Sequence, residues 1–127
     1  MALETLEPNP VWSAEAHPDT VDTLEAYRVD LVYKIWGGDW CKDCRAQLPD
    51  FGAALDAAAV PEENIEHYAV DQDKQGPGVE EYGIEYIPTV VVEQDGEEVV
   101  RFVEEEPVPI AVYLAERIRS ELGDPTE

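Results

Sequence analysis

Two cysteines, Cys41 and Cys44, lie two residues apart in the stretch "GDWCKDCRAQLP" and are the only cysteines of this 127-residue chain. A pair with this spacing can bind a metal ion, form a structural disulfide, or cycle between dithiol and disulfide. Zinc usually takes four ligands, often as two pairs, and the two histidines, His17 and His67, are not spaced as a second pair. A disulfide between such near neighbours closes a short loop and constrains the unfolded chain little. Redox chemistry is therefore favoured over a metal site or a structural disulfide.

The elements around the cysteines support this interpretation. The apolar run "DLVYKIWGG", closed by two glycines, predicts a buried strand, and a helix is predicted from the cysteines through "RAQLPDFGAALDAAAV". Cys41 then lies in the first helical turn, where unsatisfied N–H groups and the helix dipole favour a thiolate. Cys44 follows one turn later on the same face, close enough to attack a mixed disulfide on Cys41.

The rest of the chain predicts alternating helices and strands. We expect helices near residues 18–28, before Gly83 and over 109–123, and strands near 65–70, 89–94 and 97–104. The Asp95-Gly96 pair predicts a hairpin between the last two strands. The alternation predicts parallel pairing, with an antiparallel edge from this hairpin. We expect one domain over residues 1–127, with 1–17 a loosely ordered lead-in carrying a short strand near Val11–Trp12.

Several motifs together resemble the thioredoxin family over residues 21–122: "WCKDC", Pro49 five residues after the second cysteine, "AVDQD", and "YGIEYIPTVVVEQDGEEV". The resemblance implies an α/β, thioredoxin-like fold: a central mixed sheet of parallel strands plus a C-terminal antiparallel hairpin, flanked by helices. It also implies a thiol–disulfide oxidoreductase that reduces or exchanges disulfides in protein substrates. Such a protein needs no cofactor beyond the redox-active Cys41–Cys44 disulfide, and it is reduced by a thioredoxin-reductase-type electron donor.

The resemblance also implies roles for residues near the cysteines. Ile87–Pro88 is implied to be a cis peptide bond opposite them, where the backbone of Ile87 can pair with an extended substrate segment. The implied substrate-binding residues are Trp40, Ile87, Pro88 and Thr89. The charged residues expected to tune the thiolate are Lys42, Asp43 and Arg45.

Two departures from the family pattern concern the mechanism. Lys42-Asp43 replaces the usual Gly-Pro between the cysteines, and Ile35 stands where the family has a buried Asp that takes the proton of the second thiol. His67, on the neighbouring predicted strand, is one candidate replacement as proton acceptor; bulk water is the other. Two further functions stay open for the chain: a non-enzymatic thioredoxin-fold binding or adaptor module, and a thiol or metal sensor.

The charge balance narrows the possible partners. Thirty acidic residues face eight Lys and Arg, a formal net charge of −22, which disfavours nucleic acid and anionic membranes as partners. The acidic residues are spread along the chain, a pattern that resembles proteins of salt-accumulating halophiles. The sequence shows neither an apolar run of the ~20 residues that span a bilayer nor a signal-peptide pattern. We expect a cytoplasmic monomer.

Overall fold

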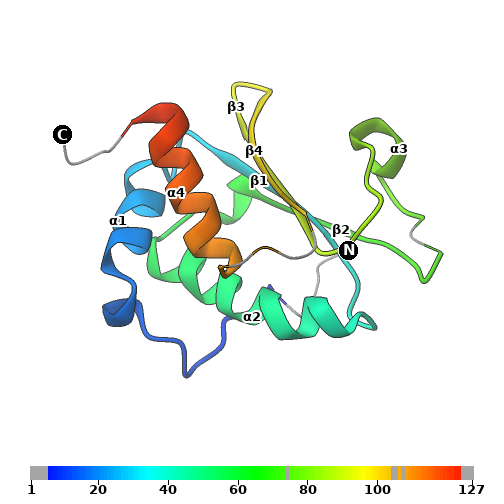
Figure 1. Cartoon of the computed structure of the whole chain (residues 1–127), viewed down its shortest axis with the longest axis horizontal. Coiled ribbons are helices and arrows are strands. Elements are labelled where there is room, and N and C mark those ends of the chain that lie inside the picture. The colour runs from blue at the N-terminus through cyan, green and yellow to red at the C-terminus, as the bar shows by residue number, and fades with distance from the viewer. Residues whose placement is uncertain (1–5, 74, 104–105, 107, 124–127) are drawn as a thin grey trace.

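The computed structural model describes residues 6–73, 75–103, 106 and 108–123. The elements follow the expected alternation of helices and strands (Figure 1). The helices are α1 (Pro18–Ala26), α2 (Lys42–Ala57), α3 (Val79–Tyr82) and α4 (Ile110–Leu122), with 3₁₀ turns η2 (Ala14–Ala16) and η3 (Glu62–Asn64). The strands are β1 (Val32–Gly37), β2 (Ile65–Ala69), β3 (Thr89–Gln94) and β4 (Glu97–Val103).

The described strands form one mixed sheet in the order β2-β1-β3-β4. β1 and β2 are parallel, with Ile35 opposite His67, whereas β3 is antiparallel to both β1 and β4. The expected hairpin is confirmed: Asp95 and Gly96 both have positive φ, 53° and 84°.

The prediction of parallel pairing is right only for β1 and β2. The connection from β2 to β3 contains α3, which has four residues. A helix of this length spans about 6 Å, so the connection lacks the long return helix that usually joins parallel strands. β3 therefore starts at the end of the sheet where β2 stops, and it runs in the opposite direction.

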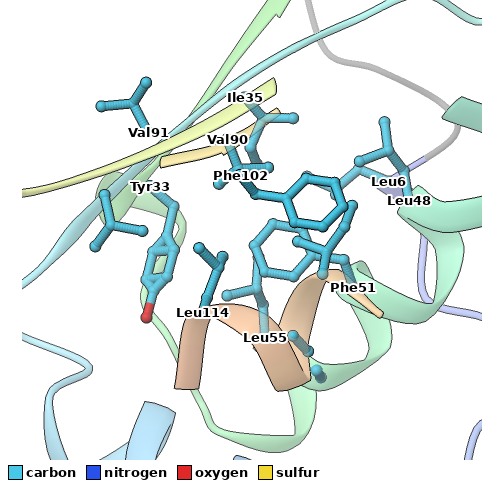
Figure 2. Packing of buried hydrophobic residues seen from close by; sticks show 14 of the residues in the cluster. Leu6, Tyr33, Ile35, Leu48, Phe51, Leu55, Val90, Val91, Phe102 and Leu114 are labelled. Atoms are coloured by element: carbon cyan, nitrogen blue, oxygen red, sulfur yellow. The ribbon is translucent and has the colours of Figure 1, made fainter. Parts of the chain in front are cut away.

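Helices α1, α2 and α4 lie on one side of the sheet and α3 lies on the other (Figure 1). Figure 2 shows side chains of β1, α2 and α4 meeting in the core between them, among them Tyr33, Phe51 and Leu114. Burial of an apolar side chain such as Phe51 or Leu114 stabilises the fold by about 1.5–3 kcal/mol. In α4 the buried residues Ile110, Leu114 and Ile118 recur every four residues and form the face that the helix turns to the core.

The described part of the expected loose lead-in packs against α2. Leu6 is buried, and its carbonyl oxygen would lie only 1.9 Å from a Cβ built on Gly52. Asn9 donates its backbone N–H to the carbonyl of Pro49 at 3.0 Å and its side-chain amide to Asp50 at 2.8 Å. These long-range contacts leave no periodic signal in the sequence.

The expectation of a strand near Val11–Trp12 was wrong. Val11 lies in a turn and is 83% exposed, and the Trp12 N–H closes this turn on the carbonyl of Asn9 at 3.2 Å. The turn is held locally: the Val11 N–H donates to the side-chain oxygen of Asn9.

Within the described ranges, no helix combines the length and the apolar character needed to cross a membrane.

Candidate active site

The two cysteines lie where β1 ends and α2 begins. Cys41 is the N-cap of α2, and its Sγ accepts a hydrogen bond from the Cys44 N–H at 3.4 Å. The Cys41 N–H donates to the carbonyl of Gly38 at 3.0 Å, which fixes the turn before the helix. Both cysteines are free thiols, with Cys41 8% exposed and Cys44 fully buried. An incoming disulfide therefore reaches Cys41 first.

The environment of Cys44 favours its protonated form. Burial raises the pKa of Cys44 to about 12, and the Cys41 thiol and the Asp43 carboxylate act in the same direction. A backbone hydrogen bond at Gly38 opposes these effects but does not overcome them. Cys44 is thus a thiol at neutral pH and must lose a proton before it can act as a nucleophile.

The three residues expected to tune the thiolate are exposed at the start of α2. Arg45 bends back and donates a guanidinium hydrogen bond to the carbonyl of Asp39 at 3.2 Å. Asp43 acts on Cys44, since its carboxylate raises the pKa of that thiol. Lys42 lies between the cysteines on the exposed side. Asp43 thus has an electrostatic effect on Cys44, the second thiol of the pair, whose pKa it raises.

Trp40 lies across the turn that precedes Cys41. Its indole Nε1 donates to the carbonyl of Val70 at 2.9 Å, and its side chain is 38% exposed. A Cβ on Gly38 would lie 2.4 Å from this Nε1, so the glycine makes room for the ring. The ring is anchored beside Cys41 with part of its surface open to a partner.

The peptide bond between Ile87 and Pro88 is cis, as the resemblance implies. Thr89 is opposite Trp36 in the antiparallel β1–β3 pair. This register places Pro88 level with the last residue of β1, at the end of the sheet where the cysteines lie. The side chains of Ile87, Pro88 and Thr89 are buried, so a substrate at this edge would meet mainly backbone.

His67 lies on β2 directly opposite Ile35, the position that replaces the family's buried acid. Burial lowers the pKa of His67 below its usual 6.5, with Glu62 opposing the shift. The imidazole is therefore neutral at pH 7 and can accept a proton. It lines a cavity of about 530 Å³ whose other walls include Leu6 and Gly52, and Cys44 is not among the lining residues.

Sequence reasoning missed the role of Trp36. Its ring is fully buried on the sheet face opposite to Ile35, and it stacks on Tyr68 with ring centroids 4.7 Å apart. Its Nε1 donates to the carbonyl of Pro77 at 2.7 Å, and its ring also contacts Tyr82 of α3. Trp36 thus holds the β2–β3 connection against the sheet. The alternation of inward and outward positions along β1 was the available signal.

A cluster of polar side chains on the same sheet face also holds α3 against the sheet. Lys34 forms an ion pair with Glu93 at 3.1 Å and donates to the hydroxyl of Tyr82 at 2.7 Å. The Tyr82 hydroxyl donates in turn to Glu93 at 2.8 Å.

Within the described ranges, no group of three or more His, Cys, Asp or Glu side chains is placed to hold a metal ion.

Comparison with known protein families shows which family the chain belongs to. The thioredoxin family model matches residues 19–116, a range that contains both cysteines and the cis proline. The chain belongs to the thioredoxin family. A search of curated protein sequences gives no significant match. Membership of the thioredoxin family supports thiol–disulfide oxidoreductase activity in general.

Solved thioredoxin structures share the fold. Thioredoxin from Fasciola hepatica is 24% identical, with a TM-score of 0.52 over 83% of this chain and 93% of that one. Oxidised mitochondrial thioredoxin 3 from Saccharomyces cerevisiae is 18% identical, with a TM-score of 0.50 over 75% and 82%. A mutant thioredoxin from Halobacterium salinarum is 22% identical, with a TM-score of 0.48 over 95% and 96%. At these identities the first two likenesses establish the thioredoxin-like fold.

Proposed function

We propose that this protein is a thiol–disulfide oxidoreductase that reduces disulfides in protein substrates by cycling Cys41 and Cys44 between dithiol and disulfide. One observation carries the proposal. Cys41 at the N-terminus of α2 keeps 8% of its surface exposed, and Cys44 is completely buried one turn behind it with its N–H on the Cys41 sulfur. A nucleophile at the surface and a protected second thiol within one turn are what a two-step exchange needs.

The first step forms a mixed disulfide. The Cys41 thiolate attacks one sulfur of the substrate disulfide, a Cys41–substrate S–S bond forms, and the other substrate sulfur leaves as a thiolate that takes up a proton. In the second step Cys44 loses its proton and attacks the Sγ of Cys41. The substrate's second sulfur leaves and is protonated. Two electrons have then passed to the substrate, and the protein holds a Cys41–Cys44 disulfide.

The second step needs an acceptor for the Cys44 proton. Ile35 carries no acceptor, whereas His67 lies opposite it in the β1–β2 register and is neutral at pH 7. We assign the proton to His67, acting through water because Cys44 does not line the cavity that His67 faces. The role of His67 is thus to stand in for the missing carboxylate.

The family membership and the site geometry support a choice of substrate and electron donor. An extended substrate segment would pair with the backbone of Ile87 beside the exposed part of Trp40. The oxidised protein is returned to the dithiol by a thioredoxin-reductase-type donor. We place the reaction in the cytoplasm, where such donors keep thiols reduced.

Reduction of insulin disulfides with dithiothreitol as donor tests the proposal. Wild type should accelerate the reduction over the donor alone, and Cys41→Ser and Cys44→Ser should each abolish the acceleration. Ala57→Ser, an exposed alanine-to-serine change at the end of the same helix, is the matched control and should keep full activity. If wild type does not accelerate the reaction, the chain is a binding module or a sensor.

A further inference from the structure

A second cavity, of about 510 Å³, lies along the first half of α2 and reaches Asp43 of the redox motif. It is bounded by the first half of α2, the start of α4 and the lead-in segment, and its lining includes Trp12, His17, Asp43 and Asp50. Asp43 stands between the two cysteines, so the cavity begins at the redox motif itself. The residues that the family resemblance assigns to substrate binding, Trp40 and residues 87–89, do not line it.

The cavity combines an apolar wall, an aromatic pair and carboxylates. Val108, Pro109 and Val112 contribute apolar surface. Trp12 and His17 stack with centroids 5.1 Å apart and rings within 8° of parallel. The carboxylates are those of Asp43, Asp50 and Glu106.

Asp50 is held in place on this wall. One of its oxygens accepts the 2.8 Å hydrogen bond from the side-chain amide of Asn9, which fixes the carboxylate where α2 meets the lead-in. The cavity therefore depends on the packing of the lead-in, and Asp50 faces any side chain that enters.

We propose that this cavity is a specificity subsite that takes an arginine or lysine side chain next to the disulfide of a protein substrate. The inference rests on the proposed function and names the substrate class for it. The aliphatic stem of such a side chain packs on an apolar wall while its cation meets carboxylates. An acidic side chain would instead face three carboxylates, and a neutral one would leave them without a counter-charge.

The position of the subsite links this preference to the chemistry. In the proposed complex, a substrate residue near the sulfur bonded to Cys41 extends past Asp43 into the cavity. A basic residue there is bound while the mixed disulfide exists. The subsite thus selects basic partners for a protein whose net charge of −22 repels acidic ones.

Three disulfide peptides, identical except for Arg, Gln or Glu beside one cysteine, test the subsite. The rate constant for reduction by pre-reduced protein is measured for each, at a KCl concentration where the protein is folded. For wild type we expect the Arg peptide to react about two- to fivefold faster than the Gln peptide, the range of one partly exposed ion pair. The Glu peptide should be the slowest.

Two isosteric variants separate a local subsite from general charge attraction. Asp50→Asn keeps an acceptor for Asn9 and should bring the Arg/Gln ratio towards one. Asp56→Asn removes the same charge from an exposed position on the same helix, outside this cavity, and should leave the ratio unchanged. Asp43→Asn should lower the ratio too; a ratio is compared because Asp43 also acts on Cys44.

Equal rates for the three peptides, or equal losses of preference in Asp50→Asn and Asp56→Asn, would overturn the subsite while leaving the proposed function intact. If reduced wild type acts on none of the peptides, the proposed function fails and the subsite fails with it.

Discussion

Cys41 and Cys44 differ in reactivity because of where α2 begins. At the N-cap, Cys41 keeps 8% of its surface exposed, while Cys44 one turn later is completely buried, and this burial raises its pKa to about 12. At pH 7 Cys44 is therefore protonated. Cys41 is therefore suited to attack the substrate disulfide, and Cys44 to resolve the mixed disulfide.

Limiting iodoacetamide should alkylate Cys41 well before Cys44 in the reduced protein. The reason is that thiolate reacts and thiol does not, and only Cys41 has exposed surface. Peptide mapping of the labelled residue checks this. Cys44→Ser should keep most of the wild-type labelling rate, and preferential labelling of Cys44 in wild type would reverse the two roles.

His67→Gln should slow the resolution of a mixed disulfide on the order of 10²-fold, a typical loss for a general base. Because burial lowers the pKa of His67, the titration step that disappears in the variant should lie below pH 6.5. Stopped-flow measurement of resolution against pH in both proteins checks this.

A purely structural His67 would behave differently. A lowered pKa contributes stability above the usual value that is lost as pH falls through the folded value. The His67→Gln variant would then change the free energy of unfolding only at acidic pH. The profiles of mixed-disulfide resolution against pH would superimpose for the variant and wild type.

Sequence could predict the site residues that belong to one contiguous motif. Cys41, Cys44 and Trp40 are close along the chain, and Pro88 belongs to a second recognisable motif. The cavity formed by Trp12, His17 and Asp50 could not be predicted, because it exists only once the lead-in has docked on α2.

At the scale of elements, features that the local sequence fixes could be predicted, and features that depend on long-range contacts could not. The Asp95-Gly96 turn and the end of α3 at Gly83 were predictable, because positive φ at these positions is a local requirement. The antiparallel β1–β3 pair was not, because it depends on how the β2–β3 connection crosses the end of the sheet. Trp36 fixes that connection from a distance of 41 residues along the chain.

Gly52→Ala should destabilise the fold by about 1–3 kcal/mol, the usual range for overpacking a core. A Cβ there would lie 1.9 Å from the backbone oxygen of Leu6, so the lead-in must move away from α2. Helix propensity alone predicts the opposite sign, since Ala is better than Gly by about 1 kcal/mol.

Urea unfolding of Gly52→Ala checks this prediction. Ala57→Gly, at the exposed end of the same helix, measures the propensity effect by itself. A higher urea midpoint for Gly52→Ala than for wild type would show that the lead-in does not pack tightly on α2.

At the scale of the whole molecule, thirty acidic residues against eight basic ones make charge repulsion the dominant surface property. The Debye length, beyond which salt screens a charge, is ~30 Å at 0.01 M salt and ~3 Å at 1 M. Repulsion should therefore destabilise the folded state in dilute buffer and become weak in molar KCl. A surface of this kind suits a protein that works in concentrated salt.

The melting temperature should rise as KCl increases from 0.01 M to 1 M. Circular dichroism at both salt concentrations measures it, and sucrose at matched osmolality serves as the uncharged control. A melting temperature that KCl does not raise would contradict adaptation to salt and would leave the redox chemistry untouched.

The central claim is that electrons leave through Cys41 and that Cys44 completes the transfer. The most direct measurement is mass-spectrometric disulfide mapping after reduced protein reacts briefly with a disulfide peptide and is quenched with acid. Wild type should hold a Cys41–Cys44 disulfide, Cys44→Ser should hold the peptide on Cys41, and Cys41→Ser should hold neither. A wild-type protein that keeps two free thiols, or a peptide trapped on Cys44 as fast as on Cys41, would contradict the account.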